Sequence, residues 1–288
     1  MPIKVPSKLP AKKQLEVEQV QLISSDTALR QDIRPMKVLL LNLMPRKRDT
    51  EIQFARLLGN SPLQIELTLM TTASYQPKNE ETTYLNEFYY TLDEIKNNFY
   101  DALIITGAPV ETLPFEEVAY WKELVNIIKW SDTHVFQRVG ICWGAQALLY
   151  HQFQIPKYSL EDKIFGIFSH QINQAKLRLM QGFTDNFPMP VSRHTETKIS
   201  DIKEYCQFDI LAYSERAGIG MIINNNNDDF FIFNHLEYDF DTLHKEYQRD
   251  LNTNQKILMP ENYYPGNNIK NLPTNIWRPF AFLLFANW

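Results

Sequence analysis

Short apolar runs that alternate with amphipathic stretches are the feature that most constrains the fold of this chain. The runs lie at 38–44, 63–69, 102–107 and 135–141. Helical spacing of apolar residues follows over about 49–59, 115–130 and 145–150. Two of the runs, 38–44 and 102–107, are almost continuously apolar, as in strands buried on both faces, whereas 63–69 alternates strictly. The alternation predicts parallel βαβ units, and therefore an α/β fold with a mostly parallel sheet and helices on both faces.

The rest of the chain is patterned less regularly. Residues 155–200 predict loops and short elements. Three strands are expected at 210–213, 220–223 and 230–233, with a polar hairpin turn at 224–229, and two helices at 241–250 and 277–288. Residues 1–35 are rich in Pro and Lys and predict an extended N-terminal arm packed on a single domain of residues 36–288 with insertions.

Composition excludes several classes of protein. A chain of 288 residues with 44% hydrophobic residues can support its own core without metal or disulfide staples. A net charge of −5 disfavours a general grip on nucleic acid or an anionic membrane. Neither an apolar leader nor a membrane-length run is found, and two cysteines are too few for a disulfide scaffold. These features predict a cytoplasmic protein with free thiols that binds neither nucleic acid nor a membrane, and they leave a homodimer open.

Cys142 occupies the position of a nucleophile. A buried strand ends at Ile141, and Gly140 and Gly144 flank the cysteine where a helix begins. This strand–turn–helix elbow lifts a side chain into solvent at the end of a sheet. Amide groups at the start of a helix favour the thiolate and can also hold an oxyanion. The alternative is that Cys142 is a small buried hydrophobe.

His235 and Glu237 are the candidate partners of that thiolate. His235 directly follows the strand that ends at Phe233, and Glu237 lies two residues further on, on the same side of extended backbone. Among the other histidines, His134 and His151 are expected to be structural. A polar loop or a His/Glu metal site are the alternatives, although no third ligand stands at a telling spacing.

The sequence resembles a known family at these and other positions. The similar blocks are 1–4, 31–35, 41–45, 103–111, 140–146, 192–196, 235–239 and 275–279. Residues 140–146 together with His235 and Glu237 resemble the Cys-His-Glu set of the class I glutamine amidotransferase fold. Over nearly its full length, the chain is similar to the bacterial homoserine O-acyltransferases that use this fold. The resemblance implies transfer of an acyl group from acyl-CoA to the hydroxyl of homoserine, in methionine biosynthesis.

The resemblance also implies residue roles. Cys142 would carry the acyl group as a thioester, with His235 as general base and Glu237 supporting the base or the substrate amine. Lys163 and Ser192 would contact substrate, and Arg249 would bind the carboxylate of the amino acid, a task that suits a planar guanidinium. Lys47 and Trp143 are candidates for holding the oxyanion. No metal and no bound cofactor are implied, because the acyl-CoA is a substrate.

Glu111 bears on the choice of acyl donor. The resemblance implies that this position lies beside the acyl group, where Gly accompanies succinyl donors and Glu accompanies acetyl donors. The carboxylate of a succinyl group would meet that of Glu111, and two like charges about 4 Å apart repel by up to about 4 kcal/mol at an effective dielectric of about 20. We therefore expect acetyl-CoA to be the donor. The alternative is that Glu111 caps a turn or faces water.

Other functions stay open at this point. Succinyl transfer to homoserine is one alternative, and acetyl transfer to serine is another. The two acceptors differ by one methylene, which a pocket separates by only about 1–3 kcal/mol. From other classes, a glutamine amidotransferase-like hydrolase would use the same triad, and a redox sensor would need only the reactive cysteine.

Overall fold

The structure, a computed structural model, describes residues 3–6, 8–28, 33–74, 82–173, 178–252, 257–271 and 273–288. The strands in this part of the chain are β1 (Ile3–Lys4), β2 (Leu22–Ile23), β3 (Met36–Leu41), β4 (Ile65–Met70), β5 (Tyr89–Tyr90), β6 (Tyr100–Ile105), β7 (Val135–Ile141), β8 (Tyr158–Ile172), β9 (Asn186–Glu196), β10 (Phe208–Ser214), β11 (Gly218–Asn224) and β12 (Phe230–Ile232). The α-helices are α1 (Ala11–Val17), α2 (Ser25–Ala28), α3 (Lys47–Gly59), α4 (Thr82–Phe88), α5 (Leu92–Ile95), α6 (Trp121–His134), α7 (Trp143–Phe153), α8 (Ile199–Lys203), α9 (Thr242–Asn252) and α10 (Arg278–Asn287). Short 3-10 turns lie at Phe115–Glu117, Arg178–Met180 and Pro265–Asn267.

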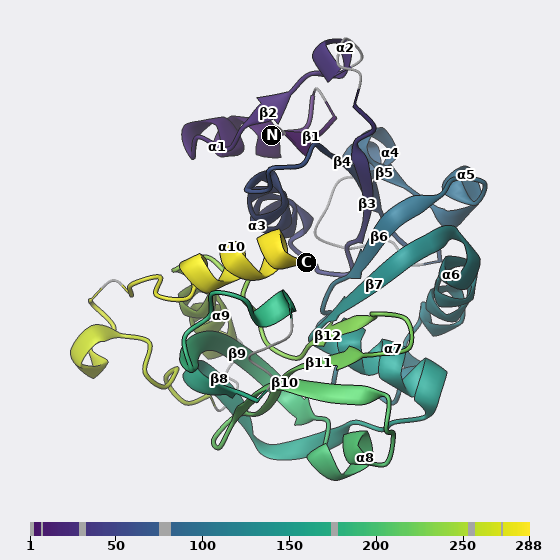
Figure 1. Ribbon diagram of the computed structural model, residues 1–288. Helices are drawn as coiled ribbons and strands as arrows, with labels where there is room; N and C mark the ends of the chain where they lie inside the picture. The colour runs from purple at the N-terminus through teal and green to yellow at the C-terminus, as the bar shows by residue number, and fades with distance from the viewer. Residues whose placement is uncertain are drawn as a thin grey trace.

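These strands form one sheet with a parallel and an antiparallel half. Its order is β2-β1-β4-β3-β6-β7-β12-β11-β10-β8-β9, with β5 beside β4. Neighbours from β2 to β12 pair in parallel, whereas those from β12 to β9 pair antiparallel. The antiparallel strands β8 to β11 lie in the lower part of the view (Figure 1). The predicted α/β fold with a mostly parallel sheet is confirmed.

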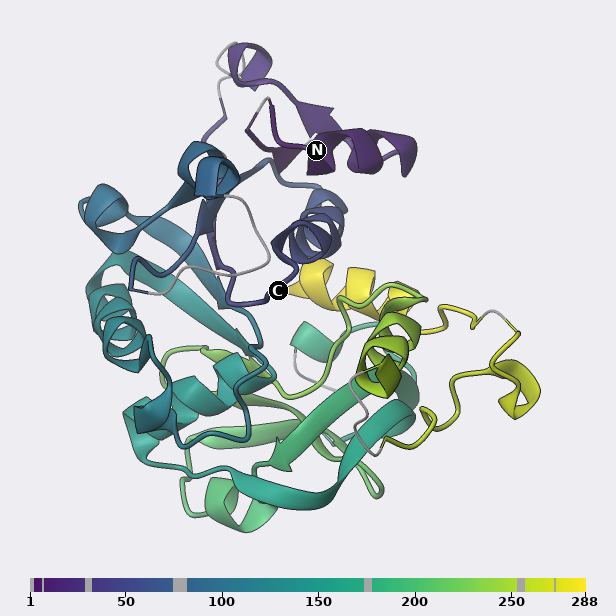
Figure 2. The ribbon, with the colours of Figure 1, turned by 180° about the vertical axis from the view of Figure 1, so that it is seen from behind.

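Helices cover both faces of the parallel half. Side chains of β3 alternate between two apolar clusters: Leu40 packs in one with α3 and α10, and Leu39 packs in the other with α6 and α7. The view from behind shows α3 beside α10, and α6 and α7 on the opposite side of the strands (Figure 2). A strand that buries both its faces must be apolar throughout, and this explains the continuous runs in the sequence.

The prediction of loops and short elements over 155–200 is wrong for most of that segment. Residues 158–172 and 186–196 are the long strands β8 and β9, which pair as an antiparallel hairpin. A register shift between Ser159 and Ile164 interrupts the two-residue period of β8. The strand β9 contains Pro188 and Pro190. It is the last strand of the sheet order, and an edge strand tolerates proline.

Two further boundaries differ from expectation. The N-terminal segment, predicted to be extended, contains the helix α1 as well as β1, which adds to the sheet beside β4. The helix expected over 115–130 is instead a 3-10 turn at Phe115–Glu117 followed by α6 from Trp121. Among the described residues, no helix is long and apolar enough to cross a membrane.

Candidate active site

Cys142 lies at the elbow between β7 and α7. Its backbone has φ 50° and ψ −116°, a strained conformation for a residue other than glycine. Its N–H donates to the carbonyl of Ile232 at 2.7 Å, so the neighbouring β12 holds the elbow in place. A Cβ on Gly144 would collide with the carbonyl oxygens of Ile105 and Thr106, because the start of α7 passes directly over the end of β6. The predicted strand–turn–helix elbow is therefore present.

His235 and Glu237 meet at the carboxyl end of β12. His235 Nδ1 lies 2.7 Å from Glu237 Oε1, and both side chains are buried. The backbone N–H of His235 donates to the carbonyl of Pro190 at 2.9 Å, and the ring stacks on Tyr238 with 4.1 Å between centroids. A Cβ placed on Gly107 would lie 3.4 Å from Cys142 Cβ and 3.7 Å from His235 Cε1. The imidazole and the thiol thus both lie beside Gly107, just after the end of β6.

The electrostatics of this group favour an ion pair. Burial disfavours a charged imidazole, but the Glu237 carboxylate and the Cys142 thiolate, which is hydrogen-bonded to His235, outweigh that effect and raise the pKa of His235 well above its usual value. A protonated imidazole beside a sulfur stabilises the thiolate, which is the reactive form of cysteine. The three residues can therefore act as a nucleophile, its acid–base partner and an orienting carboxylate.

A buried amide holds the chain directly before His235. Asn234 Nδ2 donates to His170 Nε2 at 2.8 Å, while His170 Nδ1 lies 2.9 Å from the carbonyl of Phe168. Burial lowers the pKa of His170 to about 4, so its ring is neutral and its Nε2 is free to accept. This contact anchors the chain directly after β12 and so helps to hold His235 beside Cys142.

The three residues expected to contact substrate converge on α9. Ser192 Oγ donates to Glu246 Oε2 at 2.5 Å, and Lys163 Nζ lies 3.8 Å from the same oxygen. Lys163 also lies 3.2 Å from Asp250 Oδ2, while Arg249 Nε donates to Asp250 Oδ1 at 2.8 Å. The predicted set is therefore brought together by two carboxylates of one helix.

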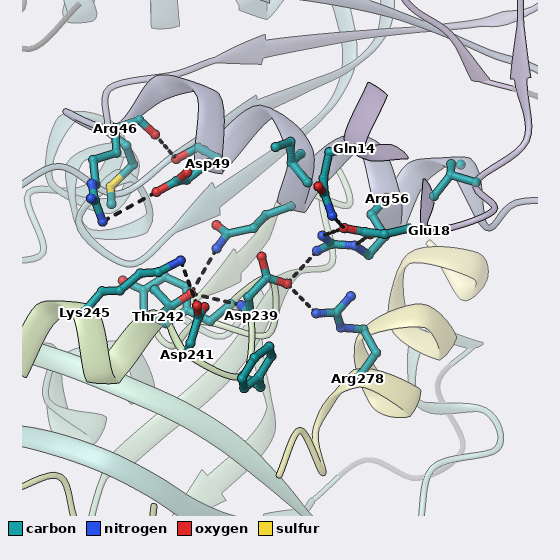
Figure 3. A pocket seen from close by; sticks show the side chains of 18 of the residues that line it. Gln14, Glu18, Arg46, Asp49, Arg56, Asp239, Asp241, Thr242, Lys245 and Arg278 are labelled. Atoms are coloured by element: carbon teal, nitrogen blue, oxygen red, sulfur yellow. Dashed lines mark hydrogen bonds and ion pairs between the residues drawn. The ribbon is translucent and has the colours of Figure 1, made fainter. Parts of the chain in front are cut away.

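A large cleft adjoins this set. Its volume is about 1780 Å³, and its lining includes Tyr238, Glu246 and Arg249. The opposite walls come from α1, α3 and α10, where Arg56 and Arg278 both donate to Asp239 (Figure 3). Asp239 lies two residues beyond Glu237, so these ion pairs tie the loop that carries His235 to the cleft wall.

Glu111 lies in the loop between β6 and Phe115–Glu117 and reaches toward β9. Its Oε2 accepts the backbone N–H of His194 at 3.0 Å and lies 3.4 Å from Thr195 Oγ1. Lys157 Nζ donates to its backbone carbonyl at 2.6 Å and so pins the loop. The alternative that Glu111 faces water does not fit this geometry.

Lys47 and Trp143, the candidates for holding the oxyanion, occupy different surroundings. Lys47 is buried at the start of α3, where its Nζ donates to the carbonyl of Asn42 and lies 5.2 Å from the ring of Tyr89. Trp143 is the first residue of α7, so its backbone N–H has no acceptor within the helix. This amide lies directly after Cys142 in the chain, at the N-terminus of α7. Among the described residues, no three His, Cys, Asp or Glu side chains cluster as a metal site requires.

Sequence reasoning missed two residues of this site. Glu246 joins Ser192, Lys163 and Tyr238, whose hydroxyl donates to its Oε1 at 2.7 Å. Its spacing of three residues before Arg249 puts both on one side of a helix, and this was the available signal. Tyr238 stacks on the ring of His235, three residues earlier in the chain. An aromatic residue after a strand does not by itself indicate such a contact.

Curated relatives match the whole chain. A family model for homoserine O-succinyltransferase matches residues 2–288. A protein of Lachnoclostridium phytofermentans named homoserine O-acetyltransferase is 48% identical over all of this chain and 96% of its own length. Proteins with the same name from Clostridium acetobutylicum and Geobacillus kaustophilus are 47% and 46% identical, again over all of this chain and 96% and 95% of their own lengths.

Solved structures with low sequence identity share the fold. A glutamine amidotransferase of Thermotoga maritima aligns with a TM-score of 0.55 and 11% identity, over 88% of this chain and 97% of that one. A glutamine amidotransferase of Methylobacillus flagellatus aligns with a TM-score of 0.56 and 10% identity, over 89% and 94%. The predicted class I glutamine amidotransferase-like fold is therefore confirmed. With a family match over nearly every residue, the chain belongs to the homoserine O-succinyltransferase family.

Proposed function

We propose that this protein transfers an acetyl group from acetyl-CoA to the side-chain hydroxyl of L-homoserine, through a thioester on Cys142. The observation that carries the proposal is the buried pair of His235 and Glu237, 2.7 Å apart, beside a cysteine held at a strained elbow. The names of the full-length relatives support the reaction and its acceptor.

In the first half-reaction, the Cys142 thiolate attacks the thioester carbonyl of acetyl-CoA. A carbon–sulfur bond forms to the enzyme, and the bond to the coenzyme sulfur breaks. His235, whose pKa is raised by its two anionic neighbours, donates its proton to the departing thiolate. The backbone N–H of Trp143 supports the oxyanion. Lys47 contributes at most indirectly, by binding the backbone carbonyl of Asn42 at the end of β3.

In the second half-reaction, His235 accepts the hydroxyl proton of homoserine while the hydroxyl oxygen attacks the acyl carbon. The ester leaves, and the thiolate forms again. Arg249 binds the carboxylate of the acceptor in this proposal, which is supported by its position in the cleft lining and by a side chain that is more than half exposed. Ser192 and Lys163 position the acceptor together with Glu246.

The donor assignment rests on Glu111. Its carboxylate is held at β9 by the N–H of His194, where it would repel the charged end of a succinyl group. Acetyl ends in a methyl group and does not meet this repulsion.

Initial rates test the proposal. With donor and acceptor both varied, a two-step transfer gives parallel double-reciprocal lines, and homoserine should be preferred to serine as acceptor. Intersecting lines would reject the thioester route. A preference for serine would reject the acceptor, and release of ammonia from glutamine at a comparable rate would favour a hydrolase instead.

A further inference from the structure

Tyr238 connects the two groups of residues in the site. Its ring stacks on the imidazole of His235, with 4.1 Å between centroids and 17° between planes. Its hydroxyl donates to Glu246 Oε1 at 2.7 Å, on α9. The other oxygen of that carboxylate accepts the hydroxyl of Ser192 at 2.5 Å. One buried side chain therefore joins the imidazole to the helix on which the expected acceptor contacts converge.

The position of the Tyr238 ring is fixed from two directions. At the backbone, Trp277 Nε1 donates to the carbonyl of Tyr238 at 2.8 Å, and Trp277 is fully buried. At the tip, the hydroxyl is bound to Glu246. Burial and the nearby carboxylates of Glu246 and Glu237 raise the pKa of Tyr238 well above its usual value, so the hydroxyl keeps its proton and remains a donor. The imidazole thus rests on a ring that is held at both ends.

The imidazole depends on this support more after acylation than before it. Before acylation, the Cys142 thiolate and the Glu237 carboxylate both hold His235, through hydrogen bonds and opposite charge. Under the proposed function, acylation makes the thiolate a neutral thioester, which no longer attracts the imidazolium. Of these contacts, the hydrogen bond at Nδ1 and the stacked ring of Tyr238 then remain. One hydrogen bond alone leaves the tilt of an imidazole poorly defined, and the stacked ring restricts it.

We propose that Tyr238 is a positioning residue of the second half-reaction: its ring, anchored by Glu246, holds the imidazole of His235 in place while Cys142 carries the acyl group. The inference rests on the proposed function, because it requires an acyl-enzyme. Tyr238 touches no substrate in this account and acts through His235 alone. Its effect is therefore independent of the molecule that accepts the acyl group.

Two acceptors separate positioning from binding. Propan-1-ol is homoserine without its amine and carboxylate, so it does not need the groups proposed to bind those charges. Its oxygen attacks the acyl carbon, His235 takes the hydroxyl proton, and the Cys142 thiolate leaves. Full-length acetyl-enzyme, freed of acetyl-CoA, is mixed with either acceptor, and loss of the acetyl group is followed by mass spectrometry. The loss in propan-1-ol includes hydrolysis, in which His235 activates water in the same way.

Tyr238→Phe keeps the ring and removes the hydroxyl. We expect discharge to slow about tenfold with both acceptors, because hydrogen bonds to charged groups are the strong ones, while acylation by acetyl-CoA changes less than about twofold. The KM for homoserine should stay nearly unchanged. The matched control is Tyr263→Phe, since Tyr263 is similarly buried and its hydroxyl accepts the N–H of His244 on α9 at 3.1 Å. This control should leave all three rates nearly unchanged.

The anchor is tested with propan-1-ol alone, because Glu246 also belongs to the proposed acceptor side. Glu246→Ala should slow discharge to propan-1-ol as much as Tyr238→Phe does. The double variant should be no slower than either single variant, because both substitutions remove the same hydrogen bond.

Four results would overturn the inference. Equal losses in acylation and discharge, or the same loss in Tyr263→Phe, would indicate a merely structural role. A loss with homoserine but not with propan-1-ol would indicate acceptor binding. Unchanged discharge in Tyr238→Phe would remove the role altogether, and additive losses in the double variant would remove Glu246 as the anchor. The proposed function fails separately: it is rejected if the wild type forms no acetyl-enzyme or transfers no acetyl group to homoserine, and neither measurement involves these variants.

Discussion

The proposed nucleophile side and the proposed acceptor side of the site are built in opposite ways. Cys142, His235 and Glu237 come from two strand ends, with exposed fractions of 9%, 3% and 7%. Lys163, Ser192 and Arg249 come from β8, β9 and α9, and the side chain of Arg249 is 56% exposed. The first group is fixed by backbone hydrogen bonds and packing. The second depends on shared carboxylates, chiefly those of Glu246 and Asp250.

This difference suggests a division of labour. A covalent step needs its groups held in one geometry, and buried backbone contacts such as Cys142 N–H to Ile232 provide that rigidity. An acceptor must enter and leave, and a side-chain ion pair such as that of Arg249 with Asp250 can exchange partners. Changes on the nucleophile side should therefore damage both half-reactions, whereas changes on the acceptor side should damage one.

The largest effect is expected at the nucleophile. Cys142→Ala should lower the turnover rate at least about ten-thousandfold, because no other group can form the thioester. Far-UV circular dichroism should stay that of the wild type. Cys206→Ala is the matched control, since Cys206 is a free and exposed thiol, and it should keep full activity. Comparable activity in the two variants would remove Cys142 from the mechanism.

The backbone at the elbow should tolerate a substitution less well than an open turn does. Gly144→Ala forces a methyl group against two carbonyl oxygens of the β6 end and should lower the free energy of unfolding by about 3 kcal/mol. Gly266→Ala has open space around it and only a φ of 64° to strain, so its cost should be about 1 kcal/mol. Urea unfolding measures both. Equal costs would mean that the close approach at Gly144 is not maintained in solution.

On the acceptor side, one half-reaction should change alone. Arg249→Ala should lower kcat/KM for homoserine by a few tens-fold, or about 2 kcal/mol, while acylation by acetyl-CoA stays nearly unchanged. The control is Arg216→Ala, which removes an exposed arginine paired with Glu261 outside the cleft lining. Equal damage to both half-reactions would make Arg249 a support of the fold and would break the contrast between the two sides.

The smallest and most specific effect is a shift in one pKa. The charges of Glu237 and Cys142 both raise the pKa of His235, whereas burial lowers it. Glu237→Gln and Cys142→Ala should therefore each lower that pKa, so the imidazole loses its proton at a lower pH than in the wild type. NMR titration of the His235 ring measures this. A pKa that does not move in either variant would contradict the ion pair.

Local sequence signals predicted the rigid half well. The strand that ends at Ile141 and the spacing of His235 and Glu237 are contained in short segments, and strand ends of a parallel sheet meet at one edge. The fold class followed from the same alternation. Where the pattern depended on register or on an edge, as in β8 and β9, the sequence indicated loops because a bulge and two prolines interrupt the period.

The acceptor half could not be predicted from residue patterns. Lys163, Ser192 and Arg249 are isolated polar residues, and only the resemblance to a family singled them out. What joins them is Glu246, and no local rule links a helix carboxylate to strands more than fifty residues earlier in the chain. The surroundings of Lys47 could not be predicted either, because its side chain donates to the backbone carbonyl of Asn42, directly after a strand.

The central claim is that Cys142 carries the acetyl group. Mixing the protein with acetyl-CoA in the absence of an acceptor, followed by rapid acid quench, peptide digestion and mass spectrometry, tests it directly. We expect one added acetyl group per chain, located on the peptide that contains Cys142 and removed when homoserine is added before the quench. An adduct on another residue, or an adduct that homoserine does not discharge, would contradict it.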